Sequence, residues 1–129
     1  MPATGNYGRD KGYDAEAAIT KYRAVKGGTG AEGVTPVTAD TDLVVGVAQY
    51  GVTTGEIAQG KGASVREEGI TIWEAGGVIS KDALVGVDAS GRCLALASGK
   101  RCHGRARQAA SGSGVRISVE LDRNGHIAA

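Results

Sequence analysis

Glycine divides this sequence into short apolar runs and so restricts the folds open to it. The chain of 129 residues contains 22 glycines, four Tyr, one Trp and no Phe. Its core must therefore be built from Val, Ile, Leu and Ala, because few aromatic rings are present to fill it. Small apolar residues between glycine turns favour short strands, and no long stretch has the 3.6-residue periodicity of an amphipathic helix. The sequence predicts an all-β fold with little or no helix.

Alternation of apolar and polar residues locates the strands. The clearest case is Val115, Ile117, Val119 and Leu121, which share one face of a predicted strand. Pro36 has no backbone N–H to donate, so its segment is expected at the edge of a sheet. Strands recur about every 8–12 residues with glycine turns between them, a spacing typical of sandwiches and barrels. The other predicted strands cover residues 19–25, 34–38, 42–49, 63–67, 70–74, 83–87, 93–97 and 101–109, and a helical turn would fit only near residues 56–59 or 80–83.

The alternating pattern begins only after residue 16. Residues 17–129 are interpreted as a single, small, largely antiparallel β-barrel or sandwich-like domain. Residues 1–16 have charges, glycines and two tyrosines but no apolar stripe, which predicts a flexible, extended N-terminal arm. This arm is either a frayed terminus or a segment that becomes ordered on a partner. In the second case Tyr7, Arg9 and Tyr13 are its candidate contacts, since tyrosine offers a large contact area with a polar tip.

One short pattern occurs twice. Residues 46–49 (GVAQ) precede a Thr/Gly turn and the strand-like residues 65–67, and residues 104–107 (GRAR) precede a Ser/Gly turn and residues 115–117. Both read as strand, turn, strand. The pattern therefore indicates two similar hairpins packed together, or else a chance match of short segments.

Charge is balanced overall but unevenly distributed. The 15 basic and 14 acidic residues argue against a strongly basic nucleic-acid binder and a highly charged disordered chain. Residues 92–129 hold seven basic and two acidic residues, whereas residues 1–91 hold eight and twelve. This asymmetry is either an ordinary solvated surface or a docking surface for an acidic partner or a second copy. In the docking case Arg101, Arg105 and Arg107 are candidate contacts, and the lack of interleaved aromatic residues argues against direct nucleic-acid binding.

Two motifs with possible binding chemistry lack their usual context. The G-x-G-x-x-G pattern in residues 28–33 precedes strand formers rather than a helix, which indicates a connecting loop and not a nucleotide site. Cys93 and Cys102 flank a predicted turn at residues 98–99, so a hairpin would bring them together. With His103 and His126 they could form a metal site; without the histidines, the two cysteines form a redox-dependent disulfide or are two small buried thiols. The spacing lacks the tight C-x2–4-C knuckle of zinc sites, which favours the thiols.

The residues needed for catalysis are sparse. His126 lies in the C-terminal tail, residues 111–114 miss the nucleophile-elbow pattern, and Glu67 and Glu68 point to opposite faces of a strand. We therefore predict no catalytic residue, no metal, no cofactor and no enzymatic activity. The longest apolar runs are shorter than the roughly 20 residues that span a bilayer, and no N-terminal signal pattern precedes them. We therefore expect no membrane partner. We expect the protein to be made in a reducing cytoplasm.

A series of short strands and glycine turns covers residues 46–48, 54–56, 63–67, 69–73, 79–84, 88–91, 104–107, 112 and 115–121. In this turn and strand punctuation, residues 39–92 resemble the head-decoration, or capsid cement, proteins of tailed bacteriophages. With the closing segments the resemblance extends over about 80 residues. Lys81 stands where that family usually has glycine, and residues 1–16 and the Cys102-His103 pair have no counterpart in the pattern.

This resemblance implies a structural virion protein. Proteins of this kind look like compact β-barrels on the outer surface of the expanded head, where they stabilise it by bridging subunits of the major capsid protein. They often occur as homotrimers at three-fold and quasi-three-fold positions. The alternative is a soluble β-barrel module that binds a small ligand or carbohydrate, which would require a pocket lined by aromatic residues.

Overall fold

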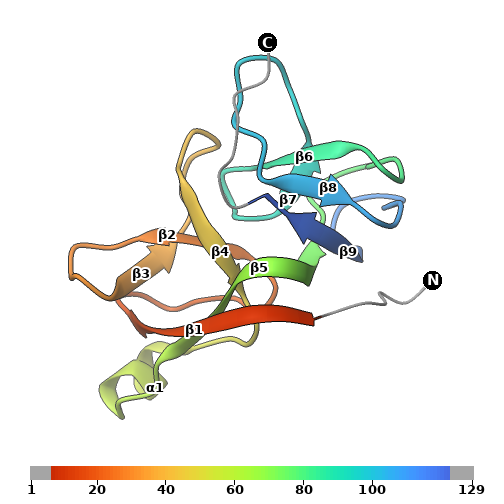
Figure 1. Cartoon of the computed structure of the whole chain (residues 1–129). Helices are drawn as coiled ribbons and strands as arrows, with labels where there is room; N and C mark the ends of the chain where they lie inside the picture. Colours follow the sequence, from red (N-terminus) through yellow and green to blue (C-terminus); the bar gives the residue numbers. More distant parts are fainter. Residues whose placement is uncertain (1–6, 123–129) are drawn as a thin grey trace.

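The computed structural model describes residues 7–122, and almost all of its regular structure is β (Figure 1). This confirms the predicted all-β class. Residues 1–6 and 123–129, including His126, lie outside the described residues, and of Tyr7 only the backbone is described. No helix in the described range is long and apolar enough to cross a bilayer. The elements are β1 (Tyr7–Ala15), β2 (Ala24–Gly27), β3 (Gly33–Pro36), β4 (Val44–Ala48), α1 (Thr54–Ala58), β5 (Ala63–Glu74), β6 (Leu84–Val87), β7 (Cys93–Ala95), β8 (Gly104–Ala106) and β9 (Arg116–Leu121).

The first five strands close into a small barrel, which we call the first barrel. Its order is β1-β3-β2-β4-β5, and β1 closes it by pairing antiparallel with β5. The β1–β3 pair is parallel and the others are antiparallel. The prediction that the segment of Pro36 lies at a sheet edge is therefore wrong. β3 lies between β1 and β2, and Pro36 follows the residues that pair with β1.

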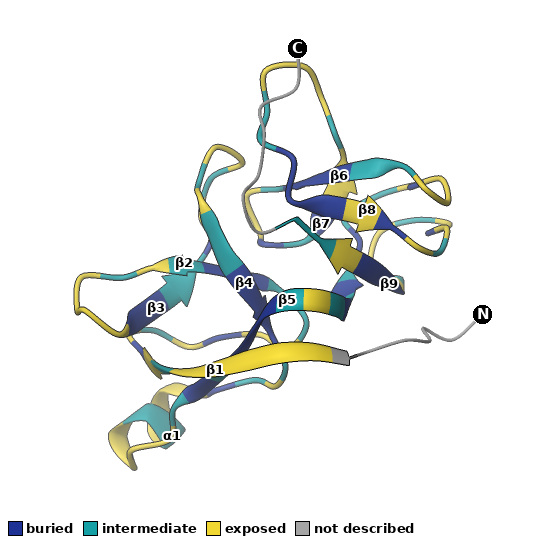
Figure 2. Ribbon diagram, in the orientation of Figure 1, coloured by how far each residue is buried: buried dark blue, intermediate teal, exposed yellow. Residues whose placement is uncertain are grey.

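β1 forms where the sequence predicts part of the flexible arm. Seven of its residues, Tyr7 to Tyr13, pair with β5, and Asp14 and Ala15 pair with β3. Most of the strand is exposed (yellow in Figure 2) and lacks an apolar face. Backbone pairing on both sides holds it in place, which a search for alternating apolar residues does not detect.

The remaining strands form a second unit, which we call the second ring. The sheet continues from the C-terminal part of β5 through β9, β8 and β6 to β7. A parallel bridge between Ala75 and Cys93 then joins β7 back to the end of β5. β5 therefore serves as the last strand of the first barrel and the first strand of the second ring. The hairpin predicted between Cys93 and Cys102 is absent, because β7 and β8 lie on opposite sides of β6.

The second ring repeats the path of the first barrel about 60 residues later. Ile19 and Val52 exchange two backbone hydrogen bonds of 2.8 and 2.9 Å, and Ile79 and Ala110 exchange two of 3.0 and 2.8 Å. The parallel pair that begins the first barrel, Ala15 with Val34, corresponds to the bridge between Ala75 and Cys93. The same order of pairings follows in both units, since β2-β3-β4-β5 corresponds to β6-β7-β8-β9.

An unusual turn conformation also occurs in both units. Tyr22 has φ 61° and Asp82 has φ 69°, a region that non-glycine residues rarely occupy. The N–H of Tyr22 donates to the Ala48 carbonyl at 2.8 Å, and that of Asp82 donates to the Ala106 carbonyl at 2.8 Å. Coincidence of rare backbone conformation and bonding partner identifies the two units as an internal structural repeat.

Two glycines explain the pattern that occurs twice in the sequence. A Cβ on Gly46 would collide with the Arg66 carbonyl oxygen, and one on Gly104 would collide with that of Glu120. Each glycine thus permits close approach of the next strand in its unit. The similarity of residues 46–49 and 104–107 therefore reflects equivalent positions in the two units. The sequence pattern matched residues 65–67 with residues 115–117. In the structure the partner residues of the second unit lie four positions further on, so that Arg66 corresponds to Glu120.

Two apolar cores lie one in each unit. The first core includes Val25, Val34 and Val65, and the second includes Trp73, Ile79 and Ile117. The second core also takes in Ala24, Val37 and Val47 from the first barrel. Trp73 is fully buried and its indole N–H donates to the Gly91 carbonyl at 2.9 Å. In Figure 2 the buried residues follow the inner sides of both units.

Candidate docking surface

Most carboxylates of the first barrel already have partners within the chain. Glu16 accepts backbone hydrogen bonds from Thr29 and Gly30, and these bonds lower the pKa of its carboxyl group. The acidic excess of residues 1–91 is therefore not a free acidic surface. Ion pairs join Arg66 to Asp10, Lys11 to Glu32 (3.0 Å), Lys26 to Asp42 (3.1 Å), Lys61 to Glu56 (2.8 Å), Arg9 to Glu68 (3.3 Å) and Arg23 to Glu74 (3.2 Å).

Basic groups of the second ring are less fully compensated. Lys81 is exposed and has no hydrogen bond or ion pair within residues 7–122. Arg105 donates to the backbone carbonyl of Asp82 at 3.1 Å, and Arg107 has only a long contact of 3.5 Å with Glu120. Arg105 and Arg107 are two positions apart on the exposed side of β8 and its continuation. We call Lys81, Arg105 and Arg107 the basic face.

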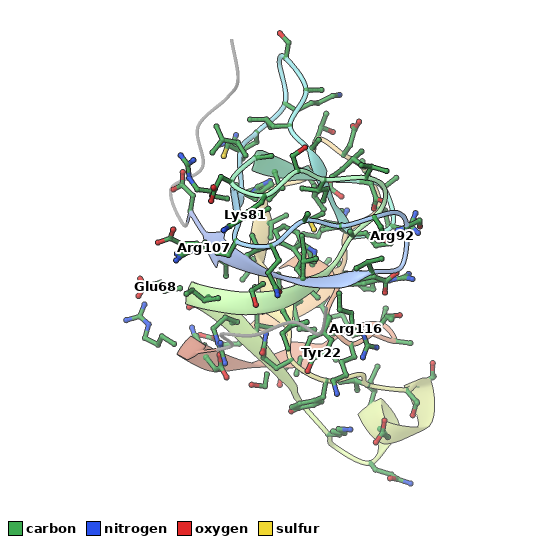
Figure 3. The ribbon with its side chains drawn as sticks, turned by 90° about the vertical axis from the view of Figure 1, so that its right-hand side faces the viewer. Tyr22, Glu68, Lys81, Arg92, Arg107 and Arg116 are labelled. Carbon is green, nitrogen blue, oxygen red and sulfur yellow. The ribbon has the colours of Figure 1, made fainter. Side chains whose placement is uncertain are left out.

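An open groove of about 490 Å³ lies beside the basic face. Lys81 and Arg107 both line it, and Figure 3 shows them on the same side of the molecule. The other lining residues come from the segment after β8 and from the turn before β9, and none of them is acidic or aromatic. They are Gln108, Ala109, Ala110, Ser111 and Val115.

A second cationic cluster joins the two units. Tyr22 stacks with Lys21 from the first barrel, whose Nζ lies 4.8 Å from the ring centroid, and with Arg116 from β9, whose Cζ lies 4.9 Å from it. Figure 3 shows Tyr22 next to Arg116. These contacts stabilise the junction through cation–π attraction. Sequence reasoning did not find this cluster, because Arg116 lies far along the chain from Lys21 and Tyr22.

The candidate residues from the predicted arm lie on β1 or at its start. The backbone of Tyr7 lies opposite Ile70. Arg9 is exposed and paired with Glu68, whereas the Tyr13 hydroxyl donates to the Glu67 carboxylate. Arg9 therefore presents its side chain on the surface, and Tyr13 has a role within the first barrel.

Arg101 precedes β8 in the sequence, whereas Arg107 follows it. Its charge, together with burial, acts on His103 at the junction of the two units, and burial is the larger cause that lowers the pKa of His103 to about 4. The Nε2 atom of His103 is buried and has no hydrogen-bond partner in the described chain. Arg105 and Arg107 thus lie on one side of β8 and its continuation, whereas Arg101 precedes the strand and acts on the buried His103.

The described side chains offer little for catalysis or ligand stacking. No group of three or more His, Cys, Asp and Glu residues within residues 7–122 could hold a metal ion. Cys93 and Cys102 are free and buried, and burial raises the pKa of Cys93 to about 12, so that its thiol stays protonated. Trp73 is fully buried and cannot stack on a ligand. Among the surface features of residues 7–122, the basic face and its groove combine exposed cations with a recess.

Comparisons with known proteins address both the fold and the family of this chain. The fold is similar to the crystal structure of the head fiber gp8.5 N base in bacteriophage phi29, with a TM-score of 0.70 and 16% sequence identity over 89% of this chain and 94% of that chain. At this identity the similarity establishes the fold alone. No curated protein sequence matches this chain. The phage cement protein family matches residues 10–121, which confirms the resemblance seen in the sequence. The chain belongs to the phage cement protein family and is a capsid-associated structural protein of the virion.

Proposed function

We propose that this protein is a cement protein on the outer surface of the expanded phage head, where it stabilises the shell by bridging neighbouring subunits of the major capsid protein. In this proposal it is made in the bacterial host cytoplasm, acts as a homotrimer at three-fold and quasi-three-fold positions, and has no catalytic activity. The observation that carries the proposal is the family match over residues 10–121.

The repeated architecture suits a bridging role. A bridge must hold two contact surfaces at a constant separation. β5 has 12 residues and belongs to both units, so it forms a continuous spine of about 40 Å. Hydrogen bonds to β1 along one part and to β9 along the other make this spine stiffer than a flexible linker.

The charge distribution supports an acidic partner. The basic face has uncompensated cations, while most carboxylates of the first barrel are already paired within the chain. Docking onto an acidic surface would neutralise this charge and would weaken as salt screens it. Tyr7, Arg9 and Tyr13 remain proposed contacts on the first barrel. Arg101 remains a proposed contact on the second ring.

Co-sedimentation with undecorated shells of the same virus tests the proposal. Unexpanded and expanded shells are incubated with increasing protein, and the bound protein is quantified in the pellet. Saturable binding to expanded shells alone supports the cement role, and the number of copies per shell identifies the symmetry positions. Absence of binding to both shells would remove the proposal.

The alternative of a carbohydrate-binding module receives no support from the described residues. Its stacking platform would need an exposed aromatic ring in a recess. The groove beside the basic face has none, and the single Trp is buried.

A further inference from the structure

The groove lies where the two units of the repeat differ. In the first barrel the chain between Val52 and β5 contains α1, and Ile57 of this helix packs against the first core. In the second ring the corresponding segment between Ala110 and β9 is a short turn without a helix. The groove is formed by Ala110 and this turn. The second ring thus leaves open a surface on which the first barrel carries a helix of its own.

Chemistry of the lining indicates what this surface would bind. Ala109, Ala110 and Val115 supply an apolar floor, while Lys81 and Arg107 supply two positive charges. Lys81 has no partner among residues 7–122, and the Arg107 contact with Glu120 is long and exposed. A carboxylate placed between Lys81 and Arg107 would form charge-assisted hydrogen bonds, and small apolar side chains beside it would cover the floor.

We propose that this groove receives a short segment of the shell protein that carries an aspartate or glutamate next to small apolar residues. The proposal deepens the cement function and rests on it. It names the groove as the main contact of the second ring and an acidic peptide segment as its occupant.

A second copy of this chain fits the groove less well. Its carboxylates on the first barrel are largely engaged in ion pairs or in hydrogen bonds to backbone N–H groups, as for Asp10, Glu16 and Glu32. Release of such a carboxylate would cost the internal contact that it makes. A shell segment whose carboxylate is free would bind without that cost, so charge complementarity favours the shell over self-association.

Charge reversal of the groove tests the proposal. The variant combines Lys81→Glu and Arg107→Glu, and the matched control is Lys21→Glu. Lys21 is the counterpart of Lys81 in the first barrel, is equally exposed and has no carboxylate partner in the described chain. Binding to expanded shells is measured at two salt concentrations, and thermal unfolding verifies that each variant is folded. A milder variant, Lys81→Ala with Arg107→Ala, serves if the double reversal unfolds.

The double reversal is expected to weaken shell affinity by about 30-fold or more, because it removes two charge-assisted contacts, while Lys21→Glu changes affinity less than about threefold. Wild-type binding that the double variant retains would overturn the groove proposal and leave the cement function standing. Failure of the wild-type protein to bind any shell would instead remove the cement function, and the groove proposal with it.

Photo-cross-linking identifies the occupant. A benzophenone side chain is introduced at Ser111, which lines the groove, and decorated shells are irradiated and digested. Cross-links to a shell-protein peptide that contains Asp or Glu support the proposal. Cross-links to a second copy of this chain, or to a peptide without an acidic residue, would overturn it.

Discussion

The chain follows the same path in the first barrel and the second ring, but equivalent segments have different structures in the two units. In the first barrel, α1 follows the bridge of Ile19 with Val52, and most carboxylates are engaged within the chain. In the second ring, a short turn follows the bridge of Ile79 with Ala110, and cations remain exposed beside a groove. The repeat thus supplies two copies of one framework, of which one carries a helix after the bridge and the other leaves a groove there.

The apolar cores of the two units differ in the size of one equivalent side chain and in how deeply it is buried. Trp73 lies two positions before Ala75, and Tyr13 lies two positions before Ala15, so the repeat places them at equivalent sites. Trp73 is fully buried, whereas Tyr13 is half-buried with its hydroxyl on Glu67. The second ring therefore depends more on one large side chain than the first barrel does.

Substitution at these equivalent sites should separate the two cores. Trp73→Ala is expected to lower the free energy of unfolding by about 3–5 kcal/mol, because it leaves a cavity and removes one of the two hydrogen bonds that the Gly91 carbonyl accepts. Tyr13→Ala should cost about 1–2 kcal/mol, since the ring is already partly exposed. Urea unfolding followed by circular dichroism measures both. Equal losses would contradict the asymmetry of the cores.

The close-approach glycines should behave alike. Gly46→Ala and Gly104→Ala each place a methyl group against a backbone carbonyl of the next strand, and each is expected to cost about 1–3 kcal/mol. Gly112→Ala is the control, because nothing lies within 4 Å of its added Cβ. Thermal unfolding gives the comparison. Tolerance of Ala at only one of the two sites would show that the repeat is not equivalent there.

The residue before each close-approach glycine should make stability depend on pH in only one unit. The first barrel has Val45 at this position and the second ring has His103. Burial lowers the pKa of His103 to about 4 from a usual value of 6.5. Between pH 6.5 and 4 the unfolded chain binds a proton that the folded chain does not, so the free energy of unfolding falls as the pH falls.

We expect this loss to be about 2 kcal/mol, complete near pH 4 and absent above pH 6.5, after allowance for solvent screening. His103→Gln removes the titrating group and should flatten the profile between pH 6.5 and 5. Denaturant unfolding at a series of pH values provides the measurement. An identical slope in the wild type and the variant would assign the pH dependence to other groups.

The smallest effect should come from Tyr22 and Asp82, the two non-glycine residues of the described chain with positive φ. Asp82→Gly relieves an unfavourable backbone conformation and is expected to stabilise by up to about 0.5 kcal/mol after the entropic cost of glycine. Tyr22→Gly gives the same relief but removes the stack with Lys21 and Arg116, so it should destabilise by about 1 kcal/mol. Differential scanning calorimetry resolves the two signs, and stabilisation by both variants would mean that the stack contributes nothing.

Local pattern was sufficient to predict much of the fold. Period-2 alternation located β9, the glycine turns indicated a barrel, and residues 46–49 and 104–107 revealed part of the repeat. β5 was predicted as two strands because Gly69 interrupts its alternation. The structure keeps the strand continuous: Gly69 has φ 93°, and Glu67 is an extra residue of β5 between the partners of Arg9 and Asp10 in β1. A local interruption can thus be absorbed by an irregularity within a continuous strand.

Long-range pairing explains what the sequence did not reveal. β1 has no apolar face, and its order comes from strands that lie far away along the chain. The uneven charge drew attention to Arg105 and Arg107, but Lys81 lies near them only because β6 pairs with β8. The groove likewise combines Lys81 before β6 with the segment after β8 and with a turn that is short by comparison with the first barrel.

Sharing of β5 has a mechanical consequence. A force that pulls the two units apart runs along this strand and loads its ladders with β1 and β9 parallel to the strands. Under such shear the hydrogen bonds of a ladder must break together, whereas a force across the strands would open them one at a time. The molecule therefore resists stretch along its spine more strongly than peeling at its ends.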